Sequence, residues 1–244
     1  MSETRGVAEG DPSSSRFNQA YQDLRNLLIS GSFPLNHRLT EAELGALLEI
    51  SRGTVRPVIV RLVQEGYLTS EPNRGVRTRM FTVEEAAEVL EAREILESAL
   101  AGKAAERATD EELEELAEIC KRMAAAEAER AEADYQTLIR RFHQRIRDAA
   151  RQPILSGFVD SLVYPLVMRQ YRDFANPHPR PNSLNEQRAI LYALQTRNAS
   201  AARAAMRHHV GSARRALLLN TQPRGKESDG TEQFKGSPMK LSVV

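Results

Sequence analysis

The chain has 244 residues, enough for two domains and for a buried core in the larger one. Its formal net charge is +1, with the basic excess in residues 16–79, which hold nine Arg or Lys against six Asp or Glu; residues 80–220 hold twenty against twenty-one. No apolar run approaches the roughly 20 residues that span a bilayer, and residues 1–15 contain no signal-peptide core, so we expect a cytoplasmic protein. The single cysteine, Cys120, excludes an intrachain disulfide and a cysteine-rich zinc site.

The two ends of the chain differ in composition from the rest. Residues 1–15 and 221–244 are polar, rich in small residues and proline, and without hydrophobic periodicity, so both are predicted to be disordered tails. Residues 17–30 have apolar side chains at helical spacing, and Gly31 ends that predicted helix. This helix would support the elements that follow it.

Residues 39–66 predict two short helices joined by a tight turn. Leu44, Leu47 and Leu48 give the first helix an apolar face. The second helix begins at Ser51, whose hydroxyl can cap the free backbone N–H groups. The apolar positions of the second helix fall on one side: Val55, Val58, Ile59 and Leu62.

The opposite side of this second helix is polar and basic. It carries Arg52, Thr54, Arg56 and Arg61. A helix fits the major groove of DNA, where such side chains contact phosphates and base edges together. The alternative is a solvated basic face that binds nothing. The cap, the turn and the hairpin described next favour a recognition helix.

A β-hairpin is predicted directly after the recognition helix. Residues 67–70 and 76–78 are β-prone, and the residues between them have turn chemistry. Gly75 would allow a close approach of the backbone to a phosphate or to the minor-groove wall, and Arg74 and Arg77 would supply charge. The hairpin would therefore be the wing of a winged helix-turn-helix.

Residues 17–79 resemble the winged helix-turn-helix of the GntR family of bacterial transcription regulators. The resemblance covers the whole domain and depends on motifs in the order that the family has them: Leu39, Glu41 and Leu44, then Ser51-Arg52, Val55-Arg56, Arg61-Leu62, Glu65-Gly66-Tyr67 and Arg74-Gly75. It implies an operator-binding protein.

One residue departs from the family pattern, which has an acidic residue after Val-Arg where this chain has Pro57. Proline lacks the N–H that would bond the carbonyl of Gly53, and an interior proline costs roughly 3 kcal/mol in a regular helix. We therefore expect a kink or a 3₁₀ turn over residues 53–57, which would alter the direction of Arg56.

From Thr82 onward the sequence predicts amphipathic helices with short connections. The capping patterns are Thr109 with Glu112, and Ser183 with Glu186. A proline-rich loop at 176–181 precedes the second of these. Six helices are predicted, over residues 83–108, 110–128, 133–150, 153–171, 183–198 and 200–219. The fold class is therefore mainly α, with an N-terminal winged helix-turn-helix at 16–79 and an antiparallel helical bundle at 80–220.

This bundle resembles the FCD ligand-binding domain of the FadR-type GntR regulators. The resemblance depends on four motifs: Glu91 to Glu97, Phe142-His143 followed by Pro153, Asn185 to Ile190, and Met206 to His209. Six helices rather than seven point to the VanR-like branch. These motifs are looser than those of the DNA-binding domain.

The FCD resemblance implies a pocket that holds a metal ion in many members. Residues four apart on a helix point the same way and can reach one ion. The matching positions here are Ile139, His143, Gln187 and His209. An isoleucine cannot bind a cation and an amide is a weak ligand, so the site is degenerate and we expect no metal or other cofactor.

The remaining pocket residues have two interpretations each. His143 and His209 are either core histidines or lining groups of an effector pocket, together with Gln187. Arg93 is either the counter-charge of a carboxylate effector or the partner of Glu97 in an exposed pair. The pocket interpretation predicts a small organic acid as effector.

These features predict a transcription regulator that binds a palindromic DNA operator as a homodimer and responds to a small carboxylate. That it acts as a repressor is implied only by the resemblance to the family. Two rivals remain: a dimeric DNA-binding protein without an effector, and a metal-dependent sensor. No nucleophile with a base and an orienting residue is visible, so an enzyme is not expected.

Overall fold

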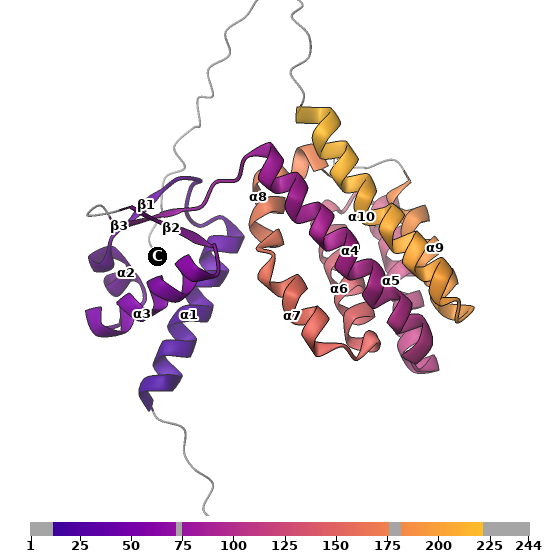
Figure 1. The fold of residues 1–244 in the computed structure, drawn as a ribbon, viewed down its shortest axis with the longest axis horizontal. Coiled ribbons are helices and arrows are strands. Elements are labelled where there is room, and N and C mark those ends of the chain that lie inside the picture. The colour runs from indigo at the N-terminus through magenta and orange to yellow at the C-terminus, as the bar shows by residue number, and fades with distance from the viewer. Residues whose placement is uncertain (1–11, 72–74, 176–181, 222–244) are drawn as a thin grey trace, which may run out of the picture.

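The structure is a computed structural model that describes residues 12–71, 75–175 and 182–221. Figure 1 shows two domains side by side, a small N-terminal one with a three-stranded sheet and a larger C-terminal one built of helices. The predicted tail at 221–244 and the predicted loop at 176–181 lie outside the described residues, apart from Thr221, which ends the last helix.

The N-terminal domain has the order of elements expected of a winged helix-turn-helix. The support helix begins at Pro12, so the prediction of a disordered tail to residue 15 is wrong for its last four residues. The elements are α1 (Pro12–Ser30), β1 (Arg38–Leu39), α2 (Glu41–Leu47), α3 (Arg52–Gln64), β2 (Leu68–Glu71) and β3 (Gly75–Thr78).

The second helix of the helix-turn-helix begins as predicted, directly after its N-cap residue Ser51. Helix α2 has a capping box, in which Thr40 accepts from the backbone N–H of Glu43 and the Glu43 carboxylate accepts from that of Thr40. Ser51 is the N-cap residue of α3, but its hydroxyl contacts the hydroxyl of Thr54 at 3.2 Å instead of a backbone N–H. The predicted 3₁₀ segment at Pro57 is wrong, because α3 runs as one α-helix through that residue.

The wing is an antiparallel pair of β2 and β3, and β1 pairs with the other edge of β3, so the sheet has the order β1-β3-β2. The short strand β1 was not predicted. Gly75 opens β3 with φ +85°, a left-handed conformation that favours glycine. A Cβ at this position would lie 2.9 Å from the carbonyl oxygen of Leu39, so the glycine allows β1 to pair closely.

The bundle contains seven helices in the described residues, not six. The stretch 153–171 forms two helices, because Val163 adopts φ +49° and interrupts the chain between them. The helix count that favoured the VanR-like branch therefore does not hold. The helices are α4 (Val83–Arg107), α5 (Asp110–Ala128), α6 (Glu132–Ala150), α7 (Pro153–Ser161), α8 (Tyr164–Ala175), α9 (Ser183–Gln195) and α10 (Ala199–Thr221).

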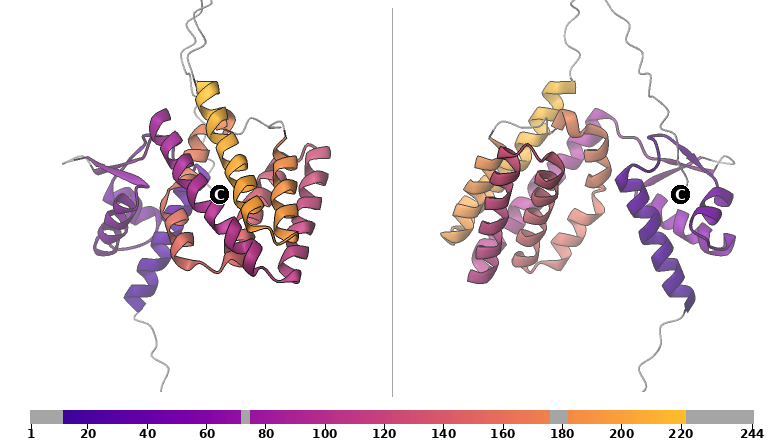
Figure 2. Two further views of the ribbon diagram at one scale, coloured as in Figure 1. Left: turned by 45° about the vertical axis from the view of Figure 1, so that its right-hand side comes forward. Right: turned by 180° about the vertical axis from the view of Figure 1, so that it is seen from behind.

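Small residues let the central helices of the bundle approach closely. Helices α4 and α10 lie side by side along the bundle (Figure 2). Helix α4 buries Ala101, Ala104 and Ala105, α10 buries Ala202, and a Cβ at Gly102 of α4 would collide with Arg203 of α10. Helices α5, α6 and α9 complete the core around Phe142 and Met123. The core therefore surrounds the helix that carries Arg93.

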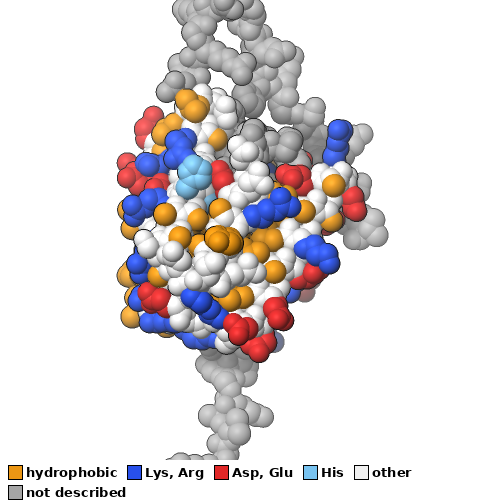
Figure 3. Space-filling view, turned by 90° about the vertical axis from the view of Figure 1, so that its right-hand side faces the viewer, with side chains coloured by type: hydrophobic (Ala, Val, Ile, Leu, Met, Phe, Trp, Pro, Cys, Tyr) orange, Lys and Arg blue, Asp and Glu red, His pale blue; other side chains and the backbone are white. Residues whose placement is uncertain are grey.

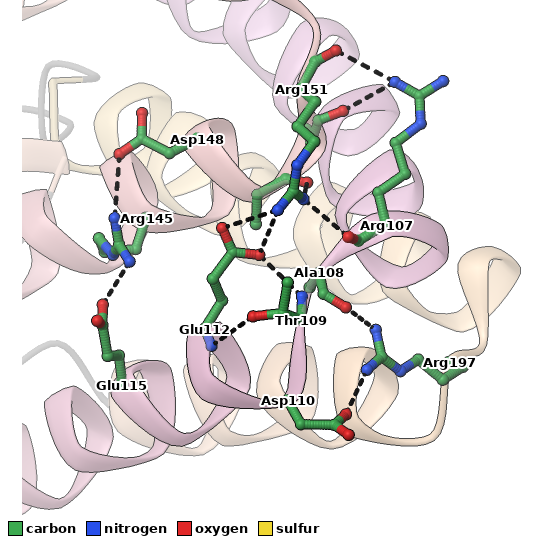
Figure 4. Close-up of polar contacts among 12 residues, drawn as sticks. Arg107, Ala108, Thr109, Asp110, Glu112, Glu115, Arg145, Asp148, Arg151 and Arg197 are labelled. Atoms are coloured by element: carbon green, nitrogen blue, oxygen red, sulfur yellow. Dashed lines mark hydrogen bonds and ion pairs between the residues drawn. The ribbon is translucent and has the colours of Figure 1, made fainter.

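Three arginines close the end of the bundle farthest from the N-terminal domain (Figure 4). Arg107 donates to the carbonyl of Ala150 at 3.0 Å, and Arg151 donates to that of Arg107 at 2.7 Å. Arg197 donates to the carbonyl of Ala108 and also contacts the carboxylate of Asp110 at 2.6 Å. These bonds satisfy carbonyls that the helix ends leave without partners, so we assign the cluster a structural role.

Within these described ranges, no helix combines the length and the apolar character that crossing a membrane would require.

Candidate functional site

The exposed end of α3 is the candidate DNA-binding surface. Arg52 is exposed at the first turn of the helix, and Thr54 is half-buried beside it. Helix α3 buries Val55, Val58 and Leu62 against the domain. The apolar and polar sides of the helix therefore lie as the sequence predicts, with Arg52 available to a nucleic acid.

The other predicted DNA contacts have partners inside the domain. Arg56 is exposed but forms an ion pair with Glu41 at 2.9 Å, which a phosphate could replace. Arg61 lies over the ring of Tyr21, with its Cζ 3.8 Å from the ring centroid, and contacts Glu65 at 2.9 Å. This position gives Arg61 a packing role that the sequence analysis did not anticipate.

In the wing, Arg77 contacts Glu71 at 2.6 Å and donates to the carbonyl of Asn36 at 3.0 Å. Gly75 is exposed at the start of β3. Arg74 lies outside the described residues. A DNA contact by Arg77 would need its present partners to be exchanged, whereas the Gly75 backbone is open to approach.

The second candidate site lies inside the bundle, where four helices bring together the four predicted effector-binding residues. Arg93 comes from α4, His143 from α6, Gln187 from α9 and His209 from α10. All four are buried, with Gln187 at 0 % exposure. Packing therefore unites residues that are up to 116 positions apart.

Two carboxylates join these residues into one buried chain of contacts. Glu97 accepts two bonds from Arg93, from Nε at 2.7 Å and from Nη2 at 3.2 Å. Its Oε2 lies 2.5 Å from Nδ1 of His143. The Nε2 atoms of His143 and His209 are 3.2 Å apart, and Nδ1 of His209 lies 2.9 Å from Oε2 of Glu186. We call this set, from Arg93 to Glu186, the buried polar chain.

The contacts fix the number of protons on the two imidazoles. Each Nδ1 faces a carboxylate and must carry a hydrogen, and a third hydrogen must lie between the two Nε2 atoms. Three hydrogens on four ring nitrogens make one of the two histidines an imidazolium. With Arg93, Glu97 and Glu186 charged, the buried polar chain is then electrically neutral, which is the condition for burying charges at tolerable cost.

Burial and neighbouring charges act against each other on these groups. Burial lowers the pKa of His143 below its ordinary value, although the neighbouring Glu97 acts in the opposite direction. Burial alone would raise the pKa of Glu97, but Arg93 and His143 outweigh it and hold that pKa well below its usual range. Glu97 therefore remains ionised at neutral pH.

Gln187 has a polar atom without a partner. Its Oε1 lies 3.5 Å from the hydroxyl of Tyr135, while its Nε2 is buried and makes no hydrogen bond. A buried donor without an acceptor costs roughly 1–3 kcal/mol. This N–H group can donate to an acceptor that enters the bundle, and it is the observation that most directly suggests a ligand there.

The residues at the family's metal positions do not form a metal-binding set. Ile139 packs against the hydrophobic core, and the Nδ1 atoms of both histidines face carboxylates. Across residues 12–71, 75–175 and 182–221, no three His, Cys, Asp or Glu side chains are arranged to hold an ion. The carboxylates at Nδ1 do not themselves exclude a metal, because such carboxylates also orient histidines that bind a metal through Nε2.

Sequence analysis missed the two carboxylates of the buried polar chain, Glu97 and Glu186. It considered Glu97 only as an exposed partner of Arg93, yet the pair is 3 % and 6 % exposed. It assigned Glu186 to a capping box with Ser183, which is wrong, because Asn182 is the N-cap and the Glu186 carboxylate holds His209 instead. The signal for Glu97 was present, since the same helix face carries Arg93 four residues earlier.

Cys120 is buried on α5 as expected, and burial raises the pKa of its thiol to about 11. A thiolate is the reactive form of cysteine. This thiol is therefore a packing residue and belongs to neither site.

Comparison with known proteins matches both domains. Residues 17–77 match the family described as bacterial regulatory proteins, gntR family, and residues 88–212 match the FCD domain, which is half of the chain. The Nta operon transcriptional regulator of Aminobacter aminovorans is 34% identical over 87 residues, which are 36% of this chain and 41% of that protein. The HTH-type transcriptional repressor RspR of Escherichia coli K12 is 23% identical over 192 residues, 79% of this chain and 84% of RspR.

Solved structures share the fold. A GntR-type putative transcriptional regulator from Rhodococcus sp. RHA1 superposes with a TM-score of 0.69 at 24% identity, covering 85% of this chain and 100% of that one. E. coli McbR/YncC gives a TM-score of 0.68 at 21% identity, covering 84% and 97%. From the two matched domains and their order, this chain is a DNA-binding transcription regulator, not an enzyme, and belongs to the GntR family as a FadR-type member with an FCD domain.

Proposed function

We propose that the protein is a homodimeric repressor that binds a palindromic operator and is released or rearranged by a small organic acid bound inside the bundle. The observation that carries the sensor part is the buried polar chain, together with the unpartnered Nε2 of Gln187. A domain that served dimerisation alone would have no use for six polar side chains in its core.

An acid effector would enter by exchange of partners. Arg93 already holds Glu97, so a ligand carboxylate that reaches Arg93 has to displace that side chain. Glu97 also holds His143 on α6, so the exchange would alter how α4 and α6 are held together. Such a ligand would bind the two arrangements of the bundle unequally, which is the requirement for shifting an equilibrium.

The proposed sensor uses no metal, since Ile139 packs against the core and the described residues place no third ligand beside His143 and His209 in an arrangement that could hold an ion. Elemental analysis of the purified protein, with a thermal-shift screen of small carboxylates in the presence and absence of a chelator, tests this. An acid that stabilises the fold equally in both conditions is expected. A stoichiometric metal whose removal abolishes the shift would replace the proposal with a metal-dependent sensor. If no small molecule shifts the melting temperature, the effector-independent alternative is favoured.

Dimerisation is proposed because palindromic operators present two half-sites to a two-fold dimer. The bundle retains exposed hydrophobic side chains on α4, α9 and α10: Ile95, Tyr192 and Leu219. Figure 3 shows hydrophobic side chains between charged ones on the face seen from the side of α9 and α10. Sedimentation analysis tests the oligomeric state, and a monomer at micromolar concentration would contradict it.

The DNA-binding part can be tested with a sequence selected by the protein from random duplexes. Arg52→Ala should weaken binding to that duplex roughly ten- to one-hundred-fold, because Arg52 is exposed at the start of α3. Arg122→Ala, at an exposed position of the bundle, is the matched control and should have no effect. Equal affinity of both variants would place the DNA-binding surface elsewhere.

Repression and a cytoplasmic location are parts of the same proposal. RspR, a relative over most of its length, is named a repressor, and a protein that binds bacterial operators works where the chromosome is.

A further inference from the structure

Helix α8 contacts both the buried polar chain and the N-terminal domain. In Figure 1 it lies on the side of the bundle that faces the N-terminal domain. At its first residue, the ring of Tyr164 stacks on Arg93, with the guanidinium carbon 3.8 Å from the ring centroid. The buried polar chain thus continues directly into α8.

The middle of α8 belongs to the hydrophobic core that the two domains share. Leu166 and Val167 are buried in one cluster with Leu24, Leu28 and Tyr67 of the N-terminal domain. Helix α8 packs against α1 along this contact. Displacement of α8 would therefore separate apolar surfaces unless α1 moved with it.

Farther along α8, two side chains hold backbone groups of the N-terminal domain and of the linker. Arg169 donates to the carbonyl of Leu28 at 2.7 Å and also to that of Phe33. Leu28 lies in the last turn of α1, whose carbonyls have no partner within the helix. Burial lowers the pKa of Arg169, but the guanidinium still binds both carbonyls.

Gln170 binds both backbone groups of one linker residue. Its Nε2 donates to the carbonyl of Phe81 at 2.7 Å, and its Oε1 accepts from the N–H of Phe81 at 2.9 Å. Tyr171 adds a bond from its hydroxyl to the same carbonyl at 2.7 Å. Phe81 lies between β3 and α4, so these bonds fix the segment that connects the domains.

Elsewhere the boundary between the domains is open. A cleft of about 390 Å³ separates α7 from the N-terminal domain. Its lining comprises Tyr21, Arg25, Gln64, Glu65 and Tyr67 on one side and Gly157, Asp160 and Ser161 on the other. The N-terminal domain is thus held at α8 and has space beside α7, which is the arrangement of a hinge with room to close.

We infer that Arg169 and Gln170 are positioning residues that set the angle of the DNA-binding domain, and that α8 transmits a change in the buried polar chain to that angle. Because Val163 interrupts the chain with φ +49°, the part of α8 that precedes its kink at Tyr171 is separate from α7 and can shift without it. The inference deepens the proposed sensor function and rests on it. A chain of contacts alone does not prove coupling, so the test measures coupling itself.

The experiment measures the distance between the domains and needs neither effector nor operator. Spin labels are placed at the exposed positions Asn26 on α1 and Ser200 on α10, in a Cys120→Ser background, with labelled chains diluted into unlabelled ones. Pulsed electron spin resonance then gives the distribution of label distances within one chain. Glu97→Gln perturbs the buried polar chain, and a triple variant with Arg169→Ala, Gln170→Ala and Tyr171→Phe removes the bonds of α8 to Leu28, Phe33 and Phe81.

Glu97→Gln should shift the mean distance by roughly 2 Å or more, the size of helix displacements in switching proteins. In the background of the triple variant the same change should add no shift, because α8 no longer holds the linker or the N-terminal domain by hydrogen bonds. Arg172→Ala, at an exposed position of α8, should leave the distribution as in the parent. If Glu97→Gln does not fold, Glu186→Gln takes its place, because it perturbs the other end of the buried polar chain.

The inference would be overturned if the distance shifts of the Glu97 variant and of the α8 variant simply added. It would also be overturned if a folded Glu97 or Glu186 variant left the label distances unchanged. Binding of the selected duplex by the same proteins separates this result from the proposed function. If the parent protein selects DNA and binds an acid, yet the shifts of its variants are additive, the proposed function stands and only the role of α8 is rejected. If the parent protein binds neither DNA nor an acid, the proposed function is rejected whatever the label distances show.

Discussion

The charge of Glu97 should be essential to the stability of the bundle. Glu97 is 3 % exposed, accepts two bonds from Arg93 and contacts His143 at 2.5 Å. Glu97→Gln keeps the shape but leaves the buried guanidinium without its counter-charge. Breaking a buried ion pair by removing one partner costs about 3–5 kcal/mol. We therefore expect the free energy of unfolding to fall by about that amount, measured by urea denaturation at a fixed protein concentration.

Two comparisons separate this effect from a general loss of charge. Glu118→Gln removes a carboxylate that is 60 % exposed and 3.7 Å from Lys121, and it should change the free energy by no more than about 0.5 kcal/mol. Arg93→Leu combined with Glu97→Gln removes the uncompensated cation and should be more stable than Glu97→Gln alone. A loss below about 1 kcal/mol for Glu97→Gln, or a double variant less stable than the single one, would refute this reasoning.

Three further outcomes follow from the structure. Because the pKa of Glu97 is lowered on folding, its contribution is present above the ordinary carboxyl pKa of about 4.5 and is lost as the pH falls below it, so the urea midpoint should drop more steeply with acid in the parent than in Glu97→Gln. Gly75→Ala should cost about 1–2 kcal/mol in urea denaturation, since the new Cβ would meet the carbonyl of Leu39 in a left-handed conformation; equal stability would contradict the assigned φ. Cys120, with its thiol pKa raised to about 11, should resist a thiol reagent at pH 8 until urea unfolds the protein, and rapid labelling of the native chain would contradict its burial.

Local sequence signals were reliable where the nearest residues decide the conformation. Thr109 with Glu112 begins a helix because the pair satisfies backbone N–H groups within four residues. The polar and apolar sides of α3 follow from helical periodicity alone. Local rules failed where the chain tolerates a locally costly residue: Pro57 lies within a continuous α-helix, and Val163 takes a left-handed conformation that β-branched residues disfavour.

For this protein, the sequence by itself determined the two domains, the helix-turn-helix with its wing, and the candidate residues Arg93, His143, Gln187 and His209. These depend on periodicity, caps and motifs, which act over a few residues. Only the tertiary structure decided that Glu97 and Glu186 hold the two histidines and neutralise Arg93, because these contacts join helices up to 66 residues apart in sequence and depend on how α4, α6, α9 and α10 pack. The same packing leaves the α8 contacts as the link between that site and the DNA-binding domain, which no local pattern encodes.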